Sequence, residues 1–213
     1  MDLLDAVESC RFLGREFLVF VWFESEVLEG QFETSDGDRF VLWLENQLVL
    51  ESESAEQEVT RMRGASPSMT SEAHEALRRG KLPVQARVRV ERGQQVYGFV
   101  LNAKTLGVSG AQLPALLKEE RDERFFERMY LIEELEKMVD AIFERFVTLR
   151  IAPVWDTKLL PMIQRWVQDP QDVDPKKYRA VCREARASMG ALGRGGKRAG
   201  WVIDGGDDAG SVS

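Results

Sequence analysis

The chain is poor in the residues that most often carry catalysis or hold metals. It contains one histidine, His74, and two cysteines, Cys10 and Cys182, which lie far apart in the sequence. A single histidine excludes most zinc sites, catalytic triads and proton shuttles, and no Gly-rich phosphate loop follows an expected strand. We therefore expect no catalytic residue, no metal, no cofactor and no small-molecule substrate, and we predict that the protein is not an enzyme.

The chain also lacks a hydrophobic run of membrane-spanning length. Its most apolar stretch, Phe17–Phe23, has seven residues, whereas a transmembrane helix needs about 20. The first residues, Met1-Asp2-Leu3, do not provide the basic start of a signal peptide. Cysteines without metal-ligand spacing are typical of free thiols in a reducing compartment. We expect a cytoplasmic protein without a membrane partner.

Positive charge is scarce overall and unevenly distributed. The net charge is −7, but eight basic and four acidic residues occur from Lys176 onward, which leaves −11 for residues 1–175. Binding to duplex nucleic acid depends largely on neutralising phosphates. The acidic body therefore argues against a nucleic-acid footprint over the whole surface, while a local basic strip remains possible.

The segment Leu13–Glu29 is the feature that the rest of the fold must cover. Its run Phe17–Phe23 is apolar throughout, and each such side chain contributes roughly 1.5–3 kcal/mol when buried. Charged flanks and the bracketing Gly14 and Gly30 favour a helix buried on several faces. A fully buried strand is the alternative, because a short apolar run also fits a strand.

Strand patterns follow this segment. Asp36-Gly37 between two apolar runs predicts a hairpin, and Val84, Ala86, Val88 and Val90 alternate with polar residues. Thr70 or Ser71 is expected to cap a short helix over Glu72–Arg79. The expected strands are Gln31–Ser35, Asp38–Leu44, Gln47–Glu53, Glu58–Arg63, Val84–Arg92, Gln95–Asn102 and Thr105–Val108.

From Leu116 the apolar period becomes helical and predicts a long amphipathic helix that ends near Pro153. Its stripe comprises Phe125, Met129, Ile132, Leu135, Val139, Ile142 and Phe146. A second helix is expected over residues 156–168. The fold class is therefore α+β, an antiparallel β-meander sheet covered by a long amphipathic helix and additional helices. We expect residues 1–170 to form a single domain, and residues 171–213 to form a basic, then Gly-rich tail that is largely disordered.

Cationic residues gather in one part of the sequence. Arg87 and Arg89 share the outward face of one expected strand, which suits phosphate contacts without sequence readout. A solvated sheet face is the alternative interpretation. If the cations bind nucleic acid, we expect them to form one continuous strip, to which the cluster within Lys176–Arg186 could add grip. The candidate nucleic-acid-binding residues are Arg61, Arg63, Arg78, Arg79, Lys81, Arg87 and Arg89.

Several short motifs resemble the carboxy-terminal part of the recombination-associated protein RdgC family. They are Thr70-Ser71-Glu72, Gly80-Lys81, the strand pair Val84–Arg92 and Gln95–Asn102, and Lys104-Thr105-Leu106; the opening GREFLVFVWFESE is similar as well. The similarity spans roughly residues 13–110 and continues more weakly to Trp166. The resemblance implies a nucleoid-associated protein that binds DNA with little sequence preference, dimerises and acts in recombination. Arg61 and Arg63 are then the nearest counterparts of the family's basic residues, and Lys81 matches its Gly-Lys.

Two hypotheses follow from this sequence. The first is a non-enzymatic, RdgC-like DNA-associated protein, cytoplasmic and located at the nucleoid, with DNA as a non-specific partner and a homodimer as a possible assembly. The second is an oligomerising protein-protein interaction adaptor that does not bind DNA, in which the apolar helix stripe forms the subunit interface.

Overall fold

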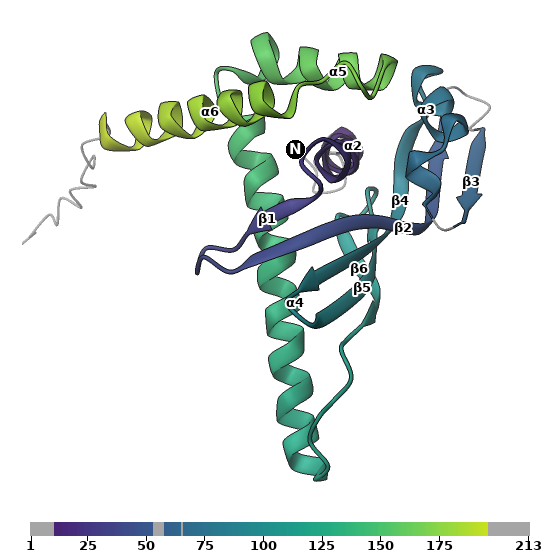
Figure 1. The fold of residues 1–213 in the computed structure, drawn as a ribbon, viewed down its shortest axis with the longest axis vertical. Helices are drawn as coiled ribbons and strands as arrows, with labels where there is room; N and C mark the ends of the chain where they lie inside the picture. The colour runs from purple at the N-terminus through teal and green to yellow at the C-terminus, as the bar shows by residue number, and fades with distance from the viewer. Residues whose placement is uncertain (1–10, 53–57, 65, 196–213) are drawn as a thin grey trace, which may run out of the picture.

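The computed structural model describes residues 11–52, 58–64 and 66–195. They form a six-stranded antiparallel sheet with helices on one of its faces, which confirms the α+β class (Figure 1). The elements in chain order are α2 (Arg11–Val27), β1 (Gln31–Glu33), β2 (Arg39–Glu51), β3 (Val59–Arg63), η1 (Pro67–Met69), α3 (Ser71–Arg78), β4 (Leu82–Arg92), β5 (Gln95–Asn102), β6 (Gly107–Gln112), α4 (Arg121–Arg150), the π-helical turn η2 (Trp155–Leu159), α5 (Leu160–Gln168) and α6 (Pro175–Gly195).

The opening apolar segment is a helix, as the flanking residues predict. Helix α2 lies against β4 and β2 on one side and against α4 and α5 on others. Phe20, Val21, Trp22 and Phe23 are completely buried. Because apolar side chains occur nearly all round this helix, it needs cover from several elements at once.

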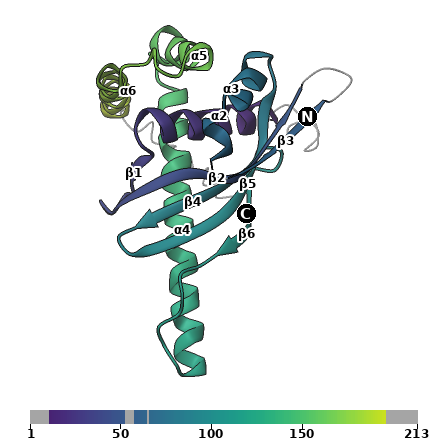
Figure 2. The same cartoon turned by 45° about the vertical axis from the view of Figure 1, so that its right-hand side comes forward.

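The sheet is a meander with one crossover. The strand order is β1-β2-β4-β5-β6. Strands β1 and β3 share one edge of β2: β1 pairs with its residues 39–41, and β3 pairs with its residues 47–51. The connection from β3 through α3 to β4 therefore passes over β2 (Figure 2). The strand pair β4–β5 matches the predicted ranges closely, and Thr70 caps α3 as expected by accepting a hydrogen bond from the Ala73 N–H at 3.2 Å.

Two strand predictions need correction. We expected two separate strands, Asp38–Leu44 and Gln47–Glu53, but β2 runs continuously from Arg39 to Glu51. A register shift against β4 between Leu44 and Leu48 accommodates the polar residues Glu45 and Asn46 as a bulge. We also expected the last strand at Thr105–Val108. The chain instead turns there, with Leu106 at a φ of 51°, and β6 begins at Gly107.

Helix α4 is only half covered by the rest of the domain. Leu135, Ile142 and Phe146 are buried, as predicted. Phe125 and Met129, expected on the same stripe, are exposed because the N-terminal half of the helix extends beyond the sheet (Figure 1). Within the described ranges, no helix is both long and apolar enough to cross a membrane, α4 included.

The packed domain continues past residue 170. We expected a tail there, but α6 contributes Tyr178, Cys182 and Ala185 to the hydrophobic core, and Val173 before it is buried too. The spacing of these three residues places them on one helix face, which the basic composition of the segment obscured. The Gly-rich residues 196–213 lie outside the described part of the chain.

Gly14 allows α2 to lie very close to the sheet. A Cβ atom at this position would stand 1.9 Å from the backbone oxygen of Ala103, whereas a Cβ at Gly64 would have nothing within 4 Å. We predict that Gly14→Ala lowers the free energy of unfolding by at least about 2 kcal/mol, as overpacking does, although alanine favours helices.

Chemical denaturation of both variants checks this prediction. Gly64→Ala is the matched control and is expected to stay within about 0.5 kcal/mol of the unmodified protein. Equal stability of the two variants would contradict the close approach of α2 to Ala103.

Candidate nucleic-acid interface

Four of the seven predicted residues lie on the face of the sheet that no described helix covers. Arg87 and Arg89 alternate with Val88, which points into the core. Arg61 pairs in register with Val49, and Arg63 with Gln47, so their side chains stand on the same open face as Arg87. This part of the prediction agrees with the alternation read from the sequence.

Carboxylates neutralise the two central arginines of this open face. Glu45 Oε2 lies 3.8 Å from Arg87 Nε, and Glu45 Oε1 lies 3.7 Å from Arg89 Nη1. Glu91 adds a closer contact of 2.6 Å to Arg89 Nη2. Among the described residues, Arg61 and Arg63 make no ion pair. The open face therefore offers two free cations at one corner and a charge-balanced centre.

The other three predicted residues do not join this surface. Arg78 donates from Nε to the backbone oxygens of Val167 and Gln168 on α5, and Arg79 pairs with Glu75 at 3.0 Å. Lys81 Nζ lies 2.9 Å from Glu58 and donates to the Thr60 hydroxyl. Since α3 packs against α5 on the helical side of the sheet, the seven residues do not form the continuous strip that we expected.

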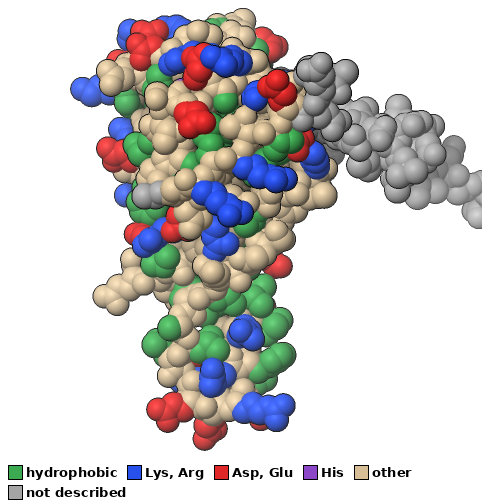
Figure 3. Space-filling model, turned by 90° about the vertical axis from the view of Figure 1, so that its right-hand side faces the viewer, with side chains coloured by type: hydrophobic (Ala, Val, Ile, Leu, Met, Phe, Trp, Pro, Cys, Tyr) green, Lys and Arg blue, Asp and Glu red, His purple; other side chains and the backbone are tan. Residues whose placement is uncertain are grey.

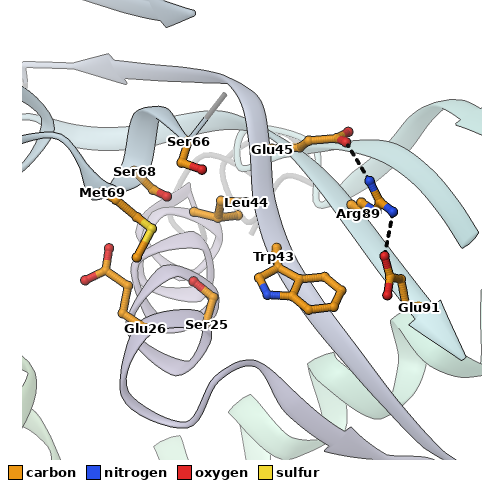
Figure 4. Close-up of a pocket in the computed structure, with 10 residues that line it drawn as sticks. All are labelled: Ser25, Glu26, Trp43, Leu44, Glu45, Ser66, Ser68, Met69, Arg89 and Glu91. Atoms are coloured by element: carbon orange, nitrogen blue, oxygen red, sulfur yellow. Dashed lines mark ion pairs between the residues drawn. The ribbon is translucent and has the colours of Figure 1, made fainter. Parts of the chain in front are cut away.

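A pocket of about 400 Å³ lies where α2, β2 and η1 meet (Figure 4). It exposes one aromatic side chain, Trp43, and carboxylates from Glu26, Glu45 and Glu91, with Arg89 as its single cation. The dashed lines in Figure 4 mark the two ion pairs that occupy this arginine. Three carboxylates around one engaged guanidinium disfavour an anionic ligand such as phosphate.

Glu26, at the edge of this pocket, joins a polar network with His74 and two tryptophans. Glu26 accepts hydrogen bonds from the indole N–H groups of Trp22 at 2.6 Å and Trp166 at 2.9 Å, and His74 Nε2 lies 3.4 Å away. In the sequence, His74 stands between Glu72 and Glu75 on an expected helix, a pattern typical of a surface or half-buried side chain. It is buried between the two tryptophan rings, which supports a packing role for the side chain.

A second group of cations lies elsewhere, in a groove of about 1020 Å³ between β1, the start of β2, α4 and α6. In Figure 1, α6 crosses the upper part of α4, and β1 lies against α4 below this crossing. Two glutamates, Glu33 and Glu144, also line the groove. We call it the arginine groove, after Arg39, Arg145, Arg179, Arg183 and Arg186.

Four of these five guanidinium groups are exposed and free. Arg179, Arg183 and Arg186 follow one another at helical spacing on the groove side of α6, and Arg39 faces them from the start of β2. None of the four has an ion-pair partner in the part of the chain that the structure describes. Their charges are therefore available to an anion, in contrast to those of Arg87 and Arg89.

The fifth arginine, Arg145, stands over a buried carboxylate. Its Nε donates to Glu24 Oε1 at 3.1 Å, and its Nη2 lies 2.9 Å from Oε2. Tyr178 donates its hydroxyl to the same Glu24 Oε1 at 2.5 Å. Burial raises the pKa of Glu24 above its ordinary value, although Arg145 and Tyr178 favour the charged form.

Burial also sets the chemistry of the two neighbouring groups. It raises the pKa of Tyr178 well above its usual range, and the nearby Glu24 acts in the same direction. The phenol therefore remains a hydrogen-bond donor to Glu24. Burial likewise raises the pKa of the Cys182 thiol to about 11, so this cysteine is an inert core residue and a poor nucleophile.

Sequence reasoning missed the groove because its cations come from three distant segments. Arg39, Arg145 and Arg179 are separated by more than thirty residues at each step, and no local pattern joins them. One signal was present. Arg179-Arg183-Arg186 and Tyr178-Cys182-Ala185 have the same i, i+4, i+7 spacing, which marks adjacent polar and apolar faces of one helix.

Comparisons with known proteins do not assign a family. No protein-family model matches the chain, and no curated protein matches it. The resemblance to the RdgC family stays a prediction.

The thiol of Cys182 provides a test of the packing beneath the groove. At pH 8, a pKa near 11 in place of the ordinary 9.0 reduces the thiolate fraction about 100-fold. In a Cys10→Ser variant, which leaves Cys182 as the only thiol, we expect alkylation by iodoacetamide to be at least that much slower in the folded than in the denatured protein.

Mass spectrometry of the alkylated protein measures both rates. The folded-state rate should keep rising with pH up to about pH 11. A folded-state rate equal to that in denaturant would contradict the burial of Cys182 between α6 and the core.

Proposed function

We propose that this chain is a non-enzymatic DNA-associated protein that binds nucleic acid with little sequence preference through the arginine groove. The observation that carries the proposal is the gathering, on one groove of an otherwise acidic protein, of four arginines that form no ion pair with any residue the structure describes. Guanidinium groups recognise phosphate oxygens through charge-assisted hydrogen bonds.

The composition of the groove supports backbone contact over base readout. Sequence is read by side chains that reach base edges, often from a helix or strand inserted into the major groove. The arginine groove is a concave surface whose cations come from a helix, a strand and a second helix. Such a surface follows a phosphate backbone and does not depend on base identity.

The resemblance to the RdgC family supports placing this activity in recombination or nucleoid organisation, at a cytoplasmic, nucleoid-associated location. The groove changes which residues we assign to DNA. Of the sequence candidates, only Arg61 and Arg63 keep a free charge among the described residues, whereas Arg87 and Arg89 are held by Glu45 and Glu91.

Two charge-reversal variants separate the groove from the sheet. Arg179→Glu with Arg183→Glu removes two groove cations, and Arg87→Glu with Arg89→Glu changes the net charge equally on the open sheet face. We expect the groove variant to bind a labelled DNA duplex at least tenfold more weakly, with a shallower salt dependence by about two phosphate contacts.

Fluorescence anisotropy between about 50 and 200 mM KCl measures both quantities. The sheet variant should bind within about threefold of the unmodified protein on several unrelated duplex sequences, because its cations are already neutralised. No binding by the unmodified protein at low salt would remove the proposal. A larger loss in the sheet variant would move the interface to the open face.

A second function, self-association, is favoured by one observation. The N-terminal half of α4 and the segment before it expose a set of large apolar side chains, and Figure 3 shows hydrophobic side chains among charged ones on this projecting lower end. Soluble monomers rarely leave so much apolar surface in one place. The set comprises Leu117, Phe125, Phe126, Met129, Tyr130 and Ile132.

We propose that this projecting end of α4 forms a homodimer contact. Phe125→Ser with Met129→Ser should then convert a dimer, seen by light scattering at micromolar concentration, into a monomer. Val96→Ser with Val108→Ser is the control, since these exposed apolar residues lie on the sheet, away from the projecting end of α4, and it should remain dimeric. A monomeric unmodified protein at high concentration would exclude self-association through α4.

A further inference from the structure

Arg145 differs from the other four arginines of the groove in being fixed in one orientation. Its side chain is only 15% exposed, and its guanidinium lies over the ring of Phe32 at 5.3 Å. Two contacts to Glu24 hold it further. Arg179, Arg183 and Arg186 are exposed on α6, so each loses more side-chain freedom when it binds an anion.

The way Glu24 holds Arg145 leaves donors for a ligand. A guanidinium has five N–H donors in a planar fork. Glu24 Oε1 accepts a hydrogen bond from Nε, and Nη2 lies 2.9 Å from Glu24 Oε2. No described residue accepts a hydrogen bond from Nη1, and Arg145 lines the groove. Among the described residues, a fixed side chain that lines the groove thus keeps N–H donors without an acceptor.

Glu24 is itself held so that it cannot swing away. It is completely buried on α2, and the Tyr178 hydroxyl from α6 donates to the same Oε1 atom that accepts from Arg145 Nε. Three elements, α2, α4 and α6, thus meet at one carboxylate. An arginine that is held in this way loses little side-chain freedom when it binds an anion.

We propose that Arg145 is the anchoring phosphate ligand of the arginine groove, with the Nη edge of its guanidinium taking two oxygens of one phosphate group, and that Glu24 and Tyr178 are its positioning residues. Arg39, Arg179, Arg183 and Arg186 then act as mobile point charges around this anchor. The inference rests on the proposed function for its partner, a nucleic-acid backbone, but the phosphate chemistry applies equally to free phosphate.

Charge-preserving substitutions separate an anchor from a diffuse cationic groove. A lysine ammonium keeps the charge, but it cannot engage Glu24 and two phosphate oxygens in one plane. We expect Arg145→Lys to weaken binding of a labelled oligonucleotide about tenfold with an unchanged salt slope. Arg150→Lys is the matched control, because Arg150 also pairs with a glutamate and lies over an aromatic ring but does not line the groove; it should bind within about twofold of the unmodified protein.

Tyr178→Phe tests the positioning role without touching any groove cation. It removes only the hydroxyl that orients Glu24, and we expect a loss of about threefold, again with an unchanged salt slope. Circular dichroism establishes that each variant is folded. If Arg145→Lys does not fold, because Glu24 loses its partner, the result for Tyr178→Phe decides the question alone.

Inorganic phosphate distinguishes failure of the anchor from failure of the proposed function. Phosphate should raise the melting temperature of the unmodified protein more than chloride does at equal ionic strength, and this difference should vanish in Arg145→Lys. That result without DNA binding would support the anchor and remove the DNA proposal. DNA binding that is equal in Arg145→Lys, Tyr178→Phe and the lysine control would overturn the anchor and leave the DNA proposal standing.

Discussion

Burial of the apolar segment Phe17–Phe23 on every side is the constraint on which the architecture depends. A single sheet covers only one side of a helix, so α2 needs α4, α5 and α6 as additional walls. Phe17 packs on Phe146 from α4, and Phe23 packs on Trp166 from α5 and Tyr178 from α6. Each of these contacts excludes water from the same interior, and the later helices supply the cover that the sheet cannot.

Glu24, the next residue after this segment, connects the packing of the core to the arginine groove. A carboxylate enclosed with apolar neighbours is costly unless charged or polar groups reach it. Arg145 and Tyr178 come from two of the walls that cover α2, and they meet Glu24 where those walls adjoin. Glu24, Arg145 and Tyr178 therefore form the polar boundary between the core and the arginine groove, and the packing of the core holds them in place.

The sequence was sufficient where one local pattern determined the outcome and insufficient where pairing across the chain determined it. The alternation of Val84–Val90 predicted both the strand and its buried face. In a sheet with one covered face, the apolar side of an alternating strand must face the core. Glu45-Asn46 has the polarity of a turn, yet its neighbours on both sides had pairing partners, so the strand continued through a bulge. The basic composition of α6 masked its apolar face. Composition counts all residues of a helix together, whereas the spacing of the apolar residues distinguishes one face from another.

The candidate site shows the same limit for electrostatics. Counting cations located Arg87 and Arg89, but their availability depends on Glu45, which lies on a strand paired with theirs. Arg179, Arg183 and Arg186 lie on a helix, outside the strand pairing that brings Glu45 to Arg87 and Arg89. Charge density along a sequence therefore indicates where cations occur, and only the fold decides which of them a ligand meets.

Helix α4 connects the two surfaces on which the functional proposals rest. Arg145 lies 16 residues beyond Met129, about 24 Å along the helix axis. A dimer contact at the projecting end would place two arginine grooves in one particle, held by rigid helices. Because phosphates are continuous along a duplex, binding of the second groove would be intramolecular and would gain from a high effective concentration. Avidity of this kind offers an acidic protein a way to hold DNA without adding cations, since it strengthens binding while leaving the net charge of each subunit unchanged.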